Sequence, residues 1–117
     1  MIDQKTVELT HSFCLRQLAQ HGYQRLYLIG SRARGTHRPT SDHDFVAVVN
    51  DDAPSHVLDG QNTKLQFEFC KFADESGIGK VDLLVSTKSR VAMLDPIPDD
   101  FVPYSCQQDG KVVWERN

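Results

Sequence analysis

The chain has little that would support a disulfide framework, a zinc site or a membrane span. Its three cysteines, at positions 14, 70 and 106, are odd in number and far apart, which favours reduced thiols in the cytoplasm. We expect them to fill small apolar positions in the core. Its longest purely apolar run, Phe45 to Val49, is far shorter than a bilayer-crossing segment, and no basic and apolar leader opens the sequence. We therefore expect a cytoplasmic protein that is neither exported nor embedded in a membrane.

An excess of positive charge is also missing. The formal net charge is -3, so long nucleic acid is not favoured as a ligand by charge alone. The 117 residues, 39% hydrophobic and 25% charged, match one globular domain spanning residues 1–117 with a single core. The five histidines lack metal-ligand spacing, and we expect them on the surface or in loops. Trp114 and the six phenylalanines are expected in the core.

Hydrophobic periodicity predicts two long helices and four strands. The helices are expected over residues 4–21 and 61–76, each followed by glycine. Apolar alternation inside the second segment also fits a strand, but its length and the break at Gly77-Ile78-Gly79 favour a helix. A short helix is expected near residues 101–108. The expected strands cover residues 26–29, 45–49, 81–85 and, as a terminal edge, 112–114. The second of these carries no charge and is expected inside the sheet.

The stretch Gly30-Ser31-Arg32-Ala33-Arg34-Gly35 follows the first strand and has the features of a phosphate-binding turn. Both glycines lack a Cβ, so the backbone can bend sharply and approach a phosphate closely. Ser31 can cap a helical turn whose free N–H groups point outward and attract an anion. The guanidinium of Arg34 could neutralise phosphate oxygens.

Three aspartates could hold divalent cations next to that turn. Asp42 and Asp44 open the second strand, and Asp82 lies inside the third. Residues two apart in a strand face the same side, roughly 6.5 to 7 Å apart, so Asp42 and Asp44 point one way and His43 the other. Mg²⁺ prefers such hard oxygen ligands together with substrate phosphates. If the third strand lies beside the second, Asp82 reaches the same face, and the acids can hold two ions about 3.5 to 4 Å apart.

Each of these features taken singly has a simpler explanation. A lone Asp-x-Asp is usually a solvated loop or a helix cap, and Asp82 alone would more often be an edge-strand residue facing water. Their order along the chain makes a shared role more probable than each feature does alone. An apolar strand is followed by Gly-Ser and, after ten residues, by Asp-x-Asp at the start of a second apolar strand; a later strand contains the third acid. Because chance assembly in that order is improbable, we predict one combined site.

This pattern resembles the minimal nucleotidyltransferases of the DNA polymerase beta superfamily. The resemblance rests on Gly30-Ser31-x-Ala33-Arg34-Gly35, on Ser41-Asp42-x-Asp44-Phe45 and on Val81-Asp82-Leu83-Leu84. It implies an α+β nucleotidyltransferase fold, with a small mixed β-sheet and helices packed on one side. The position between the two neighbouring acids is commonly apolar in the family and is His43 here. Because His43 faces away from the metals, we expect altered packing without loss of activity.

The resemblance also implies an activity: magnesium-dependent transfer of a nucleoside monophosphate, AMP from ATP, to a hydroxyl, with pyrophosphate leaving. Asp42, Asp44 and Asp82 would be the catalytic residues and the ligands of two Mg²⁺ ions, with Asp82 helping to deprotonate the acceptor. The nucleotide-binding residues would be Gly30, Ser31, Arg34 and Ser41.

Freestanding members of this size resemble the antitoxin of bacterial pairs whose partner is a helical, RNA-cleaving toxin of the HEPN type. In that reading the acceptor is a tyrosine of the toxin, although no residue here identifies it. Two alternatives stay open. One is transfer to a small molecule such as an aminoglycoside. This alternative is less favoured, because so short a chain has few residues left to form a domain that binds the acceptor. The other is a non-catalytic module that blocks a toxin by contact. Assembly into a homo-oligomer is also left open.

Overall fold

The computed structural model describes residues 4–30, 35, 43–54, 58, 63–78, 81–91 and 111–116. Four of the predicted site residues, Ser31, Arg34, Ser41 and Asp42, lie outside the described residues, as does the short helix expected near residues 101–108. The remaining predicted elements can be compared with the structure directly.

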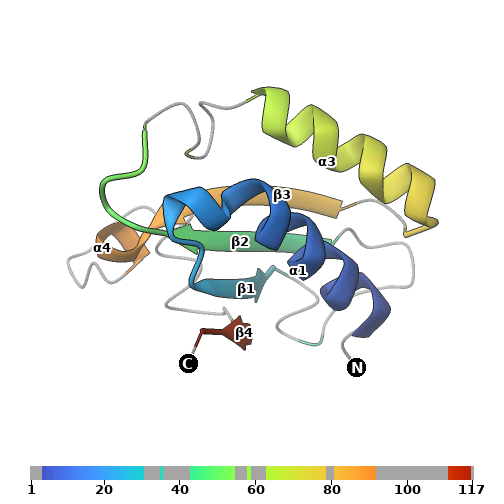
Figure 1. The fold of residues 1–117 in the computed structure, drawn as a ribbon. Coiled ribbons are helices and arrows are strands. Elements are labelled where there is room, and N and C mark those ends of the chain that lie inside the picture. Colours follow the sequence, from blue (N-terminus) through green and yellow to red (C-terminus); the bar gives the residue numbers. More distant parts are fainter. Residues whose placement is uncertain are drawn as a thin grey trace.

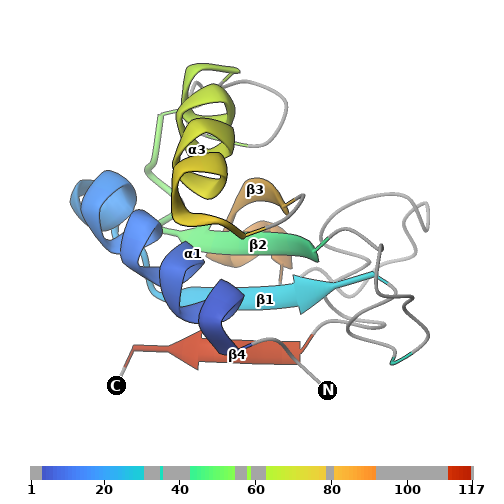
Figure 2. The ribbon, with the colours of Figure 1, turned by 90° about the vertical axis from the view of Figure 1, so that its right-hand side faces the viewer.

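Four strands form one mixed sheet in the order β3-β2-β1-β4 (Figures 1 and 2). The strands are β1 (Arg25–Ile29), β2 (His43–Val49), β3 (Val81–Thr87) and β4 (Lys111–Glu115). β1 is antiparallel to both β2 and β4, whereas β2 and β3 run parallel. The uncharged stretch of β2 is therefore an inner strand, as its composition predicted, and β4 is an edge. All four strands predicted from the sequence are present.

Helices α1 (Gln4–Leu18) and α3 (Thr63–Ser76) pack on one face of this sheet. The 3-10 turn η1 (Ala19–His21) continues α1 and ends at Gly22, whose φ of 77° lies in the left-handed region that favours glycine. Gly77 ends α3 in the same way, with a φ of 73° and a bond from the Ile78 N–H to the Ala73 carbonyl of 3.2 Å. The helix predicted over 61–76 is thus confirmed, and the α+β architecture agrees with the expected fold.

Alternation along the strands separates two clusters of buried side chains. The larger cluster lies between the sheet and the helices and includes Phe13 and Cys14 of α1 and Phe69 of α3. The smaller lies on the opposite face and consists of Tyr27, Ile29, Val46, Val48 and Val91, with Leu84 packed against it. Val91 belongs to α4 (Lys88–Val91), a single turn that the sequence did not predict. Both faces of the sheet are thus partly covered.

Three expectations about burial were wrong. Phe67 is 73% exposed, because it lies on the outer side of α3, away from Phe69. Cys70 is also exposed and fills no core position, whereas Cys14 is fully buried. His43 is 6% exposed in the sheet, because strand alternation points it toward the helices.

No helix within the described part of the chain is long and apolar enough to cross a membrane.

Candidate functional site

Asp44 and Asp82 are brought together by the pairing of β2 with β3. In this parallel pair Asp44 is the register partner of Asp82, and neighbouring strands lie about 4.8 Å apart. Their flanking residues Phe45 and Leu83 belong to the core under the helices, so both aspartates face the other side of the sheet. Asp44 is half-buried and Asp82 is exposed. The geometric condition for a shared carboxylate site is therefore met by these two residues.

Gly30 lies directly against the Asp44 carboxylate. Ile29, the last residue of β1, is the register partner of Asp44. Gly30 then takes a φ of 78°, and a Cβ at this position would stand only 2.9 Å from the Asp44 carboxylate oxygen Oδ2. Any other residue would be strained by the backbone and would also press on the carboxylate. The end of β1 can thus come close to Asp44 only because residue 30 has no side chain.

His43 takes no part in this face of the sheet. Its ring is parallel to that of Phe45, with an interplanar angle of 5° and centroids 6.1 Å apart. Residues two apart in a strand share a face, so His43 points toward the helices while Asp44 points away from them. This is the direction that the sequence predicted for His43, although its deep burial was not expected.

The two acids fit a hard divalent cation in their chemistry. Carboxylate oxygens are preferred ligands of Mg²⁺, which usually takes only one or two of them and completes its shell with water and substrate phosphates. Within the described residues, no three His, Cys, Asp or Glu side chains gather closely enough to hold a metal ion. The three-acid cluster needs Asp42, which lies outside those residues, and so it stays a prediction.

A pocket at the other end of the same sheet face was missed by the sequence analysis. It is lined by Gln24, Arg25, Tyr27, Val48, Lys88 and Val91. These residues come from β1, from β2 and from α4, together with Gln24 just before β1. Because they are scattered over three distant segments, no local motif signals the pocket. Of these residues only Arg25 and Lys88 are charged, and two separate basic residues do not by themselves predict a binding site.

Comparisons with known proteins agree with this fold. Eleven chains of solved structures match. A Sulfolobus solfataricus protein assigned as a nucleotidyltransferase is 21% identical, with a TM-score of 0.50, over 96% of this chain and 82% of its own. A toxin–antitoxin structure with AMP-PNP is 18% identical, with a TM-score of 0.50, over 89% of this chain and 72% of its own.

A third structure is a mutant of the toxin–antitoxin pair MntA–HpeT. It is 20% identical, with a TM-score of 0.56, over 98% of this chain and 74% of its own. A search of curated proteins found no match. At these identities the structural likeness shows the fold alone, but a model of the nucleotidyltransferase domain family matches residues 13–105, most of the chain. The chain therefore belongs to the nucleotidyltransferase domain family.

Proposed function

We propose that this nucleotidyltransferase moves AMP from ATP to a hydroxyl of a partner protein, with Mg²⁺ as cofactor, and that the partner is a toxin it neutralises. The acceptor group would be a tyrosine of a HEPN-type toxin. The observation that carries this proposal is the pairing of Asp44 with Asp82 on one sheet face, next to the side-chain-free backbone of Gly30. Two carboxylates beside a glycine without a Cβ suit a reaction between a metal-bound triphosphate and a hydroxyl.

In this reaction the acceptor oxygen forms a bond to the α-phosphorus of ATP, and the bond from that phosphorus to pyrophosphate breaks. The proton of the acceptor hydroxyl passes to Asp82, whose exposed carboxylate can be reached from solvent. Asp44, half-buried against Gly30, would hold the metal and fix the position of the α-phosphate. Bound Mg²⁺ would neutralise charge on the triphosphate and on the leaving pyrophosphate.

The phosphates of ATP would lie along the turn that begins at Gly30. Gly30 has a φ of 78°, and without a Cβ its backbone could lie close to phosphate oxygens. Ser31, Arg34 and Ser41 are assigned to the same nucleotide by the sequence motif, and Asp42 to the metal. Such a site would act mainly through alignment and charge neutralisation, as phosphoryl-type transfer requires.

Two of the structural relatives support the choice of nucleotide and partner. One is a toxin–antitoxin with AMP-PNP, an ATP analogue. The other is a toxin–antitoxin mutant in which two aspartates, two positions apart, are replaced by glutamate. Asp42 and Asp44 have the same spacing in this chain. These likenesses motivate the toxin partner and the test of the aspartates.

The experiment is incubation of the chain and a co-expressed helical partner with each nucleoside triphosphate, followed by intact mass measurement. We expect the partner to gain the mass of AMP with ATP and Mg²⁺, and not with EDTA. Asp44→Asn should abolish the gain, whereas Asp74→Asn, at an exposed position of helix α3, should not. An aminoglycoside gaining the mass instead would replace the protein acceptor, and neutralisation by Asp44→Asn without any mass change would favour the non-catalytic module.

A further inference from the structure

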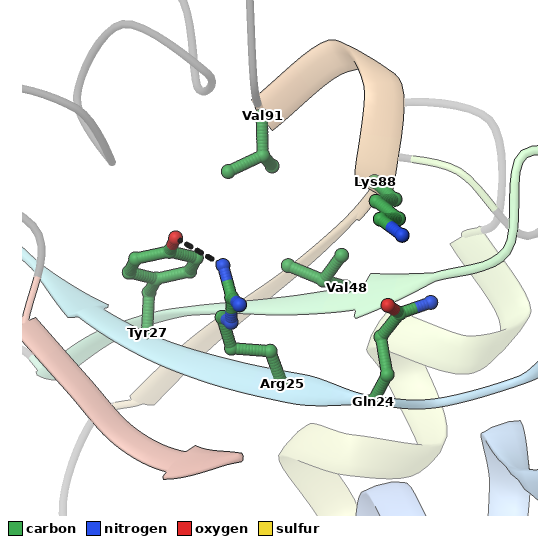
Figure 3. Close-up of a pocket in the computed structure, with 6 residues that line it drawn as sticks. All are labelled: Gln24, Arg25, Tyr27, Val48, Lys88 and Val91. Atoms are coloured by element: carbon green, nitrogen blue, oxygen red, sulfur yellow. Dashed lines mark hydrogen bonds between the residues drawn. The ribbon is translucent and has the colours of Figure 1, made fainter. Parts of the chain in front are cut away.

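The pocket on the far end of the sheet face is a small cavity of about 140 Å³. Figure 3 shows Lys88 and Gln24 at one end of it and Tyr27 and Val91 at the other, with the Arg25 side chain between them. Val48 on its floor lies four residues beyond Asp44 along β2. At about 3.3 Å per residue this is roughly 13 Å, so the pocket is separate from the acidic site.

The lining of this pocket is rich in hydrogen-bond donors and contains no acid. Arg25 and Lys88 are cations, and the Tyr27 hydroxyl lies beside them. The Gln24 amide nitrogen already donates to the Gly22 carbonyl at 3.4 Å and to Asn50 Oδ1 at 3.1 Å. Val48 and Val91 are buried, at 3% and 5% exposure, and supply an apolar floor and wall. Two positive charges over an apolar surface favour an anion that also carries an apolar part.

Arg25 is held in place by its neighbours. Its Nη1 donates to the Tyr27 hydroxyl at 3.1 Å, and its Nε lies 2.7 Å from a Glu115 carboxylate oxygen. The guanidinium also lies over the Tyr27 ring, 5.8 Å from the centroid. The hydrogen bond to Tyr27 raises the pKa of Arg25, and a guanidinium is already charged at neutral pH. A guanidinium has five N–H donors, so these contacts orient the group and leave donors for a ligand.

Lys88 supplies the second charge, and no ion pair of its ammonium is seen within the described part of the chain. The nearby Asp51 carboxylate is engaged elsewhere, because it accepts from the Ser89 backbone N–H at 2.8 Å and from the Ser89 hydroxyl. These bonds, more than Lys88, lower the pKa of Asp51. The Lys88 ammonium is thus available at the mouth of the pocket.

We propose that this pocket binds an oxyanion, the phosphate or carboxylate group of a small ligand. Arg25 holds the oxyanion with an oriented guanidinium, and Lys88 supplies the second charge. Val48 and Val91 contact the ligand's apolar part. The site stands independently of the proposed transfer reaction, because none of its residues belongs to the acidic site or to the glycine-serine turn.

The test is NMR of the full ¹⁵N-labelled chain, observing the Arg25 Nε–H and the Gln24 side-chain amide. The probes are inorganic phosphate and N-acetylglutamate, with sodium chloride at equal ionic strength as the comparison anion. We expect saturable shifts with at least one oxyanion and none with chloride. Phosphate alone would identify a phosphate ligand, N-acetylglutamate alone a carboxylate, and both an oxyanion of either kind.

Lys88→Met, which keeps a long apolar stem, should weaken this binding about tenfold. Lys71→Met is the matched control, because Lys71 is exposed on α3 over the other sheet face. The proposal is overturned if neither oxyanion saturates the shifts, if chloride reproduces them, or if Lys88→Met binds as tightly as the unaltered chain. The NMR shifts need neither ATP nor a toxin, so failure here leaves the transfer reaction untouched.

Discussion

Asp44 of β2 and Asp82 of β3 are direct register partners in a parallel strand pair, and both face away from helices α1 and α3. They differ in their surroundings. Asp44 is half-buried beside Gly30, whereas Asp82 is exposed on an edge strand. Two carboxylates fixed at neighbouring positions with unequal access to solvent suit unequal tasks. In the proposed reaction, Asp44 would hold the metal and Asp82 would receive the proton of the acceptor hydroxyl.

Asp82→Asn should lower kcat for nucleotidyl transfer at least about 100-fold, since several kcal/mol of charge stabilisation and the proton acceptor are lost together. Because Asp82 is exposed, thermal unfolding should be nearly unchanged. Steady-state kinetics with ATP and calorimetric melting measure the two effects. Asp74→Asn is the control and should keep full activity; an active Asp82→Asn would remove Asp82 from the mechanism.

Gly30→Ala should damage both folding and transfer. Position 30 has a left-handed φ, and a residue with a Cβ in that conformation destabilises the folded state by about 1 to 2 kcal/mol. The added methyl would also stand 2.9 Å from Asp44 Oδ2. Gly77→Ala is the matched control, because Gly77 has a φ of 73° but no atom within 4 Å of its Cβ position. We expect similar losses of unfolding free energy in urea, with loss of transfer only in Gly30→Ala. Equal activities would show that Gly30 has no role beyond its backbone conformation.

Phe69→Ala should destabilise the chain by about 3 to 5 kcal/mol, the usual cost of removing a buried aromatic ring. Phe69 is fully buried, with its ring centroid 5.0 Å from that of Phe13. Phe67→Ala, two residues away and 73% exposed, should change stability by less than about 0.5 kcal/mol. Urea unfolding of the two variants measures the difference. Similar losses would contradict the observed orientation of α3.

His11 should make stability depend on pH. Its Nδ1 lies 2.9 Å from the Tyr23 hydroxyl and its ring packs 4.3 Å from that of Trp114. Burial lowers the pKa of His11 from 6.5, so between its lowered pKa and 6.5 the unfolded chain binds more protons than the folded one. The stability that neutral His11 confers is therefore complete above 6.5 and is lost as the pH falls through the lowered pKa.

The measurement is the free energy of unfolding between about pH 7.5 and 5. His11→Phe keeps an aromatic ring but cannot titrate, so its stability should fall less steeply with acid than that of the unaltered chain. His21→Gln, at the end of η1, is the control and should follow the unaltered chain. If His11→Phe shows the same slope, protonation of His11 does not contribute to acid unfolding.

Much of the fold could be predicted because its signals are local. The apolar spacing before Gly22 and the glycine after residue 76 predicted α1 and α3, and short apolar runs predicted the strands. Side-chain burial was harder. All six phenylalanines were expected in the core because they are large and apolar, whereas the packing of α3 on the sheet buries Phe69 and leaves Phe67 exposed. Likewise, α4 is a single turn held by Asp51, which lies 38 residues from Ser89.

The sequence by itself determined which residues can form the acidic site and which way their side chains face. Strand alternation sets Asp44 and His43 on opposite faces, and glycine at position 30 permits a φ that other residues rarely adopt. Only the tertiary structure decided that β3 lies beside β2 with Asp82 opposite Asp44, and that Arg25 and Lys88 share a pocket. The physical reason is that alternation and turn geometry act between adjacent residues, whereas strand neighbours and register depend on how distant segments bury their apolar surfaces together.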